Sequence, residues 1–319
     1  MPNLTQIPLA EIQAARQRIS GAVPRSPLIR FNGEAGAEIY LKLENLQPIR
    51  SFKLRGASNA MLLVDKQKIS QGVYTASMGN MAQGVAWNAR KLGVPCTVIV
   101  PHNAPAAKLN AIEQMGGKLI KVPFEEWWQV LVTSRFEGLS GHFIHPVSDP
   151  TVMAGHGTIG LEILEELPEV DAIVIPYGGG GLSSGIASAI RALKPDTKIF
   201  ACEVETAAPL SAALKAGRPE SIDYKPSFVE GIGGKSVLPV MWPMVSRLLD
   251  GALVVSLAEI AEAIRLLIKN NCVVAEGAGA ASLAAALSGQ AGSGKIVCVI
   301  SGGNIDLAKL AVILNGRIP

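Results

Sequence analysis

The sequence predicts an α/β fold with parallel sheets, arranged as one large domain or two closely associated ones. At 319 residues the chain is long for a single hydrophobic core. Hydrophobic residues make up 49% of it and charged residues only 17%, which suits strands that are buried on both faces. Apolar runs of strand length and helix length alternate along most of the chain, and 33 glycines are available for the turns between them.

Composition and charge argue against two classes of partner. The net charge is only +3 and no dense basic cluster occurs, so nothing supports nucleic-acid binding. No uninterrupted apolar run reaches membrane-spanning length, because Glu259, Glu262 and Arg265 interrupt the run 252–268. The N-terminus lacks the basic start, apolar core and cleavage site of a signal peptide. We therefore expect a cytoplasmic protein with no membrane or nucleic-acid partner.

The cysteines predict neither a disulfide framework nor a metal site. Cys96, Cys202, Cys272 and Cys298 are isolated from one another in the sequence. Zinc sites and disulfide-rich domains show closely spaced pairs instead. We expect buried free thiols and no bound metal.

The first half of the chain reads as a set of alternating strands and helices. Leu9, Ile12, Ala15 and Ile19 recur at helical spacing, which predicts a helix over 8–20. The further elements expected here are strands at 38–43, 72–76, 96–100 and 118–122 and helices at 81–92 and 106–115.

The second half repeats this alternation after a segment rich in turn residues. His145-Pro146 and Asp149-Pro150 lie in the segment 143–150, where we expect the chain to cross between domains. The elements expected beyond it are helices at 157–167, 183–193, 257–270 and 279–287 and strands at 172–176, 198–203 and 296–300.

Lys53 is the first candidate for chemistry. It stands between Phe52 and Leu54, in a segment that leads from a loop into a run that can be helical. A lysine beside an aromatic ring can be partly desolvated, and desolvation favours the neutral, nucleophilic amine. A solvated surface lysine explains the same residues, and this stretch alone leaves both interpretations open.

Four consecutive glycines, Gly178, Gly179, Gly180 and Gly181, form the second candidate. They follow the strand-like run AIVIP and precede a helical run, so several backbone N–H groups and a helix N-terminus can converge on one anion. The sequence predicts a phosphate site here, with a tight turn as the alternative. Ser183 and Ser184 occupy the place of the third glycine of a dinucleotide-binding fingerprint, which the segment therefore does not match.

Two further loops carry polar groups at the ends of predicted strands. Ser77 and Asn80 lie in the segment 75–84, where a helix N-terminus can bind a carboxylate or phosphate. Ser301 follows the strand 296–300, at the end of a parallel strand where α/β sheets bind their ligands. Ordinary helix capping explains either loop equally well.

These motifs together resemble one enzyme family. In chain order, ENLQPIRSFKLRGA, SMGN, GHGTIGLEI, YGGGG and SGGN are similar to segments of the pyridoxal-phosphate-dependent threonine dehydratases and serine racemases, which have fold type II. The resemblance implies a large domain, 1–48 plus 143–319, and a small domain, 49–142. Each would be a mostly parallel twisted sheet flanked by helices, with the cofactor in the cleft between them.

The resemblance also implies the role of each motif residue. Lys53 would be the catalytic residue and would hold pyridoxal 5'-phosphate as a Schiff base. Cofactor contacts would come from Phe52, Lys53, Asn80, Gly178, Gly179, Gly180, Gly181, Leu182, Gly231, Glu276 and Ser301. Substrate contacts would come from Ser51, Ser77, Met78, Gly79 and Met81.

The implied reaction converts a 3-hydroxy amino acid of the threonine or serine type to a 2-oxo acid and ammonia. The implied assembly is a homodimer. Because the sequence ends at Pro319, we expect no C-terminal regulatory domain and no feedback by isoleucine.

Some residues depart from the family pattern. Racemases have a second serine where Met78 stands, so we expect poor racemase activity. Met81 replaces a histidine, which favours a bulky apolar substituent such as that of β-phenylserine, or else places Met81 in the core. Pro209 takes the place of the carboxylate that joins Glu203 in a cation site, so we expect no metal activation. For Arg50 we expect a surface position or contact with a substrate carboxylate.

Two alternatives to a dehydratase stay open. The first is a racemase or another β-elimination or replacement enzyme of the same fold. The second is a non-catalytic ligand-binding α/β protein in which Lys53 has no chemical role.

Overall fold

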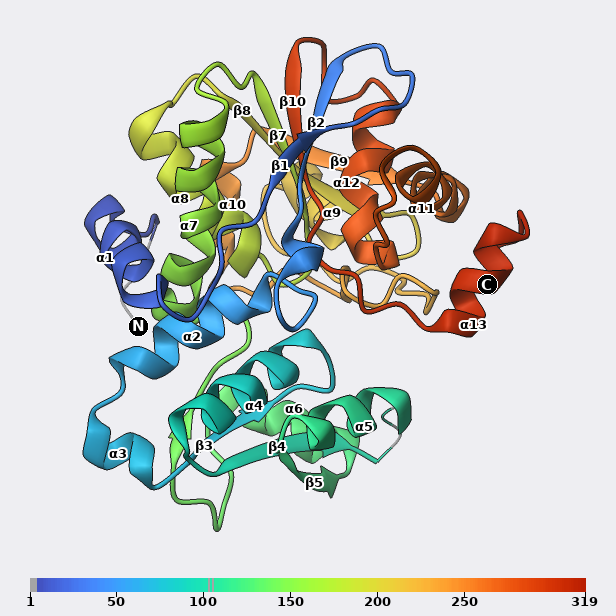
Figure 1. Ribbon diagram of the computed structural model, residues 1–319. Coiled ribbons are helices and arrows are strands. Elements are labelled where there is room, and N and C mark those ends of the chain that lie inside the picture. Colours follow the sequence, from blue (N-terminus) through green and yellow to red (C-terminus); the bar gives the residue numbers. More distant parts are fainter. Residues whose placement is uncertain (1–4, 103, 105) are drawn as a thin grey trace.

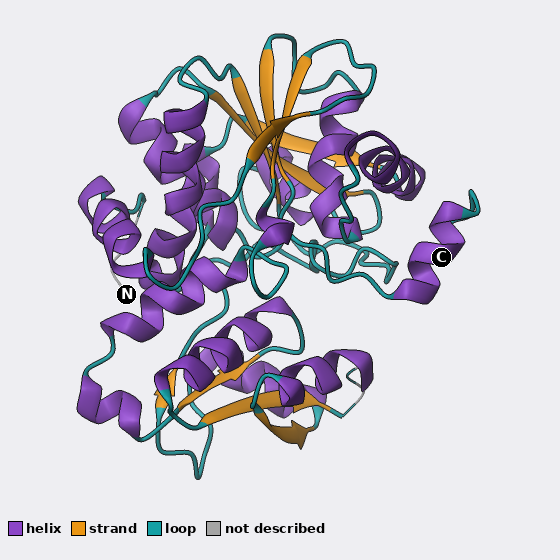
Figure 2. Cartoon of the chain, viewed as in Figure 1, coloured by secondary structure: helices purple, strands orange, loops and turns teal. Residues whose placement is uncertain are grey.

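The computed structural model describes residues 5–102, 104 and 106–319, without the side chains of residues 106 and 107. The first four residues of the N-terminal stretch lie outside this range. The described chain forms two sheets, one of six strands and one of four, each with helices packed on it (Figures 1 and 2). The prediction of an α/β fold with two mostly parallel sheets is confirmed.

The six-stranded sheet draws its strands from both ends of the chain. Its order is β1-β2-β10-β7-β8-β9, and only the pair β1 and β2 is antiparallel. Its strands are β1 (Leu28–Arg30), β2 (Glu38–Lys42), β7 (Ala172–Pro176), β8 (Lys198–Val204), β9 (Gly251–Val255) and β10 (Lys295–Val299).

The four-stranded sheet comes from the middle of the chain and is entirely parallel. Its order is β5-β4-β3-β6. Its strands are β3 (Val73–Ala76), β4 (Cys96–Pro101), β5 (Lys118–Val122) and β6 (His142–Phe143). Val98, Ile99 and Val100 of the central strand β4 are fully buried, as expected for a parallel strand that is covered on both faces.

Helices cover both faces of the large sheet. Ile173 and Ile175 of β7 pack in one hydrophobic cluster with α1, α7, α8 and α10, while Ala172 and Val174 point into a second cluster with α11 and α12 (Figure 1). These helices are α1 (Leu9–Ile19), α7 (Pro150–Glu166), α8 (Gly181–Leu193), α10 (Trp242–Leu248), α11 (Leu257–Asn271) and α12 (Gly277–Leu287).

The remaining helices are shorter or lie nearer the small sheet. They are η1 (Glu44–Leu46), α2 (Lys53–Leu63), α3 (Lys66–Ser70), α4 (Asn80–Leu92), α5 (Ala106–Gln114), α6 (Phe124–Thr133), α9 (Pro209–Ala216) and α13 (Leu307–Leu314). Within the described ranges, the helices are either too short or too polar to cross a bilayer.

The strands fall on both sides of the domain boundaries expected from the sequence. The large sheet uses segments before residue 48 and after residue 143, and β6 lies at the second boundary. Helix α2 belongs to the segment 49–142 in sequence but packs closely on α7. A Cβ at Gly155 of α7 would lie 2.5 Å from the carbonyl oxygen of Arg55. The division 1–48 plus 143–319 and 49–142 stays a prediction.

Helix α7 begins seven residues earlier than the sequence pattern indicated. The Asp149 side chain accepts the N–H of Thr151 as an N-cap, and Pro150 occupies the first turn. The glycines at 155 and 157 looked unfavourable for a helix, but they allow α7 to contact α2 and α8 closely. The sequence pattern also did not indicate β1, β9, α3, α6, α9, α10 or α13.

The cysteines are free, and one of them is not buried. Cys96, Cys202 and Cys298 are buried in β4, β8 and β10. Cys272 is exposed, so the expectation of burial was wrong for this residue. It ends α11 in a left-handed conformation with φ 55°, at the surface.

A buried charge network fixes the start of α2. The Arg55 guanidinium donates to both carboxylate oxygens of Glu44 at 2.8 Å, and to Glu162 of α7 at 2.6 and 2.8 Å. Lys42 of β2 forms a second ion pair with Glu162 at 2.8 Å. Since all four side chains are buried, charge balance depends on every member. Arg55 is the third residue of α2, so the network holds this end of the helix against both the large sheet and α7.

Replacing Arg55 by methionine should destabilise the protein strongly. The change leaves Glu44 and Glu162 buried without this partner, which costs about 3–5 kcal/mol. Urea unfolding followed by circular dichroism measures this loss. The exposed pair Arg218–Glu220 provides the control, because Arg218→Met should cost less than about 1 kcal/mol. Equal midpoints for the two variants would contradict a supporting role for the buried network.

Candidate active site

Lys53 is the first residue of α2, and its amine is held in a partly buried position. Nζ donates a hydrogen bond of 2.7 Å to the carbonyl oxygen of Pro146 and lies 5.2 Å from the centre of the Phe52 ring. Burial lowers the pKa of Lys53 to about 8. A substantial fraction of the amine is therefore neutral near pH 8. This environment differs from that of the solvated surface lysine that the sequence left open.

The segment before Lys53 is tied to the end of β10. Ser51, fully buried, forms an isolated antiparallel bridge with Gly302. The N–H of Phe52 donates to the carbonyl oxygen of Ser301 at 3.1 Å. These contacts bring the serine that follows β10 next to the lysine segment, although about 250 residues of sequence separate them.

The glycine loop lies between β7 and α8 and packs on the segment that holds Lys53. A Cβ at Gly179 would lie 2.5 Å from a methyl carbon of Val147, and one at Gly181 would lie 2.7 Å from the carbonyl oxygen of Val147. Gly180 has φ 94°, which disfavours any side chain. Val147 directly follows Pro146, the acceptor for Lys53. The amine and the glycine loop thus contact consecutive residues of one segment.

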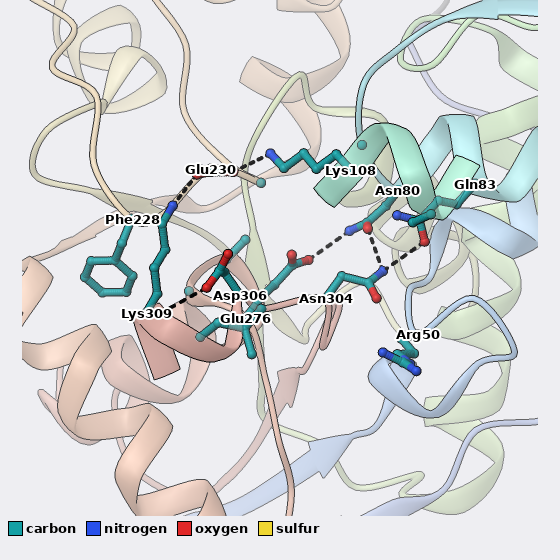
Figure 3. Close-up of a pocket in the computed structure, with 16 residues that line it drawn as sticks. Arg50, Asn80, Gln83, Lys108, Phe228, Glu230, Glu276, Asn304, Asp306 and Lys309 are labelled. Atoms are coloured by element: carbon teal, nitrogen blue, oxygen red, sulfur yellow. Dashed lines mark hydrogen bonds and ion pairs between the residues drawn. The ribbon is translucent and has the colours of Figure 1, made fainter. Parts of the chain in front are cut away.

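Asn80 links the two sheets through its side chain. Its Nδ2 donates to Glu276 at 2.9 Å, and the Asn304 side chain donates to its Oδ1 at 2.8 Å (Figure 3). Burial raises the pKa of Glu276 to about 7, although the hydrogen bond from Asn80 opposes the shift. A Cβ at Gly231 would lie 3.7 Å from a Glu276 oxygen, so Gly231 is adjacent. Three predicted cofactor residues therefore lie together.

A cavity of about 410 Å³ extends from this group of residues, lined in part by Arg50, Gly79, Asn80, Gly231 and Glu276 (Figure 3). Arg50 is exposed and has a left-handed backbone with φ 57°. Among the described residues that line this cavity are neither Lys53 nor those of the glycine loop. The structure thus forms two adjoining groups of predicted residues, one around Lys53 and one around Asn80.

Ion pairs cross the cleft at the far end of the same cavity. Glu230 pairs with Lys108 of α5 and with Lys309 of α13 (Figure 3). Since α5 packs on the small sheet and α13 on the large one, Glu230 connects the two bodies. These pairs were not foreseen from the sequence.

The SMGN loop has mixed exposure. The Ser77 hydroxyl accepts the N–H of Gly79 at 3.3 Å, and Gly79 is the N-cap of α4 without a side-chain cap. Met78 is partly buried beside the core of the small sheet. Met81 is 2% exposed and packs inside that core, as in the second of the two positions that the sequence left open. A substrate contact of Met81 stays a prediction.

Three contacts of Lys53 and its neighbours were missed in the sequence. Pro146 and Val147 lie in the segment expected only to cross between domains. His156 of α7 is buried with its ring centre 4.8 Å from that of Phe52. The sequence offered no signal for these contacts beyond the two X-Pro turns of the crossing segment, because each depends on how α7 packs on α2.

The residues present fit pyridoxal 5'-phosphate. A desolvated amine suits its aldehyde, and the loop at Gly178–Gly181 has no side chains in the space that a Cβ would fill. Helix α8 begins at Gly181, so its first N–H groups are available to a phosphate. Ser301 is buried beside the lysine segment, where its hydroxyl can meet a ring nitrogen.

Comparison with known proteins agrees with this fit. The family model described as "Pyridoxal-phosphate dependent enzyme" matches residues 19–302. The chain is 39% identical to the L-threonine ammonia-lyase of Thermotoga maritima over 97% of this chain and 78% of that one.

Two solved structures are similar over nearly the whole chain. Maize serine racemase superimposes with a TM-score of 0.89 at 32% identity and covers 98% of both chains. The threonine deaminase of T.th. gives 0.86 at 34% identity, over 93% of this chain and 98% of that one. Together with the fold and the site, these findings show that the chain belongs to the family of pyridoxal-phosphate-dependent enzymes with fold type II.

Proposed function

We propose that this enzyme is a dehydratase that converts a 3-hydroxy amino acid to a 2-oxo acid and ammonia. The observation that carries the proposal is the desolvated amine of Lys53, which is anchored at Pro146 next to the glycine loop. The similarity to an L-threonine ammonia-lyase and a threonine deaminase supports the substrate class. A cytoplasmic homodimer is the assembly that we propose with it.

Lys53 is the residue that we propose to hold the cofactor and to move the substrate proton. Bound pyridoxal phosphate supplies the electron sink that makes the Cα–H of an amino acid acidic. A lysine with a pKa of about 8 can accept this proton at neutral to mildly alkaline pH. Loss of the Cα proton and the β-hydroxyl releases one water. Hydrolysis then consumes one water and releases ammonia, which balances the reaction.

The other predicted residues keep their binding roles in this proposal. The backbone of Gly178–Gly181 and Leu182, at the start of α8, binds the phosphate. Asn80, Gly231, Glu276, Ser301 and Phe52 surround the ring of the cofactor. Ser51, Ser77, Met78, Gly79 and Met81 form the substrate side, where the N-terminus of α4 attracts the substrate carboxylate.

Racemisation is the alternative activity, and the similarity to maize serine racemase keeps it open. Racemisation needs an acid–base group on the face of the substrate opposite the lysine. Met78 has only a thioether, which cannot exchange a proton. We therefore propose that elimination prevails.

Lys53→Ala should reduce 2-oxo acid release by at least about a thousandfold, because the proton acceptor and the attachment point are both lost. The test is a panel of 3-hydroxy amino acids, assayed for 2-oxo acid and for change of chirality. The absorbance band of a lysine-bound cofactor, near the boundary of the visible and ultraviolet, should be absent from the variant. A protein that stays colourless with excess pyridoxal phosphate, or a fully active variant, would refute the proposal.

Met78→Ser should increase racemisation relative to 2-oxo acid release. The hydroxyl restores a group that can exchange a proton, and general acid–base catalysis contributes about 100- to 10,000-fold in enzymes. We expect the ratio of the two activities to rise at least about tenfold. Chiral chromatography of recovered L-serine measures this ratio, and an unchanged ratio would contradict the role assigned to Met78.

Gly179→Ala should weaken cofactor binding at least about tenfold while the protein stays folded, since its Cβ would lie 2.5 Å from Val147. Equilibrium titration of cofactor-free protein with pyridoxal phosphate measures the affinity. Gly36→Ala is the matched control, because its Cβ would meet no atom within 4 Å. Equal affinities for the two variants would argue against a phosphate site at this loop.

A further inference from the structure

His156 of α7 is a buried polar side chain without a visible partner. It is 0% exposed, and neither ring nitrogen has a hydrogen-bond partner among the described residues. An unpaired buried donor or acceptor costs about 1–3 kcal/mol. Such groups are few in folded proteins, so each requires an explanation. Burial, together with the nearby charges of Lys53 and Arg55, holds the pKa of His156 well below its usual value. The imidazole is therefore neutral.

Two glycines on neighbouring helices make room for this ring. A Cβ at Gly56 of α2 would lie 2.4 Å from His156 Cε1, and one at Gly185 of α8 would lie 3.2 Å from His156 Cβ. A contact of 2.4 Å is sterically impossible without rearrangement. The imidazole thus occupies a slot that both neighbouring helices leave open for it.

Within this slot the imidazole contacts the ring of Phe52. The ring centres are 4.8 Å apart and the planes meet at 68°, which is the edge-to-face arrangement that aromatic pairs prefer. The same Phe52 ring lies 5.2 Å from Lys53 Nζ. The backbone of Phe52 is fixed separately by its hydrogen bond to Ser301. His156 therefore acts on the side chain of Phe52, not on its backbone.

We propose that His156 is a positioning residue, which holds the ring of Phe52 and through it keeps the amine of Lys53 shielded and correctly oriented. The inference rests on the proposed function of Lys53. A neutral aromatic ring suits this task, since it supports Phe52 by an edge-to-face contact and adds no second charge beside the amine. The contact energy compensates in part for the unpaired ring nitrogens.

The test measures the pKa of Lys53 directly, in protein from which the cofactor has been removed. The rate at which trinitrobenzenesulfonate modifies Lys53 is followed against pH, with the Lys53 peptide quantified by mass spectrometry. In the unaltered protein the midpoint should lie near pH 8. His156→Leu keeps an apolar side chain but removes the aromatic edge. Water should then reach the amine, and the midpoint should rise by about one pH unit.

A double-mutant cycle separates this role from a general loss of stability. If His156 acts through Phe52, adding His156→Leu to Phe52→Leu should shift the midpoint no further than Phe52→Leu alone. His156→Phe retains an aromatic ring and should restore the midpoint. In the loaded enzyme, kcat of His156→Leu should fall about tenfold with little change in KM, because the amine is misoriented rather than the substrate unbound.

Ile159→Val is the matched control, since Ile159 is equally buried on α7 but packs in the core behind it. This variant should lose some thermal stability and leave the midpoint unchanged. The other titratable groups facing the site, His145 and Arg55, stay the same in every variant.

An unshifted midpoint in His156→Leu, or additive shifts in the double variant, would overturn the positioning role and leave the dehydratase proposal intact. Full activity of Lys53→Ala would instead remove the proposed function, whatever the midpoints show.

Discussion

The buried guanidinium of Arg55 is the interaction on which the geometry of this enzyme depends. It pairs with Glu44 below the large sheet and with Glu162 on α7, and it lies two residues beyond Lys53 on the same helix. Its position therefore sets both the axial position and the rotation of the turn that carries the amine. Charged groups at this depth are rarely favourable for stability alone. Here their strict geometry gives the reactive end of α2 a single position.

Around this fixed point the site is assembled from segments that are distant in the sequence. The lysine segment meets the end of β10 through Phe52 and Ser301, and it meets the crossing segment through Pro146. The glycine loop packs on Val147 of that crossing segment. A parallel sheet makes such convergence natural, since the carboxyl ends of its strands share one edge. The chemistry thus depends on long-range packing as much as on local motifs.

The sequence predicted those parts whose physical signal is local. Four glycines between an apolar strand and a helix predict their loop directly, and periodicity predicts α4 and α11 closely. The same periodicity could have placed Met81 with Val85 on the buried face of α4. In contrast, the contact between Lys53 and Pro146 spans 93 residues, and the slot for His156 requires knowing that α7 lies against α2. No pattern within one segment encodes these pairings.

The crossing segment 143–150 serves two purposes at once. It carries the chain from the small sheet back to α7, and through Pro146 and Val147 it also forms part of the wall around the amine. The joint between the two bodies is thus a component of the reactive surface. Any rocking of one sheet against the other would move the acceptor of Lys53 directly. Evolution or engineering cannot change the flexibility of this joint without also changing the basicity of the amine.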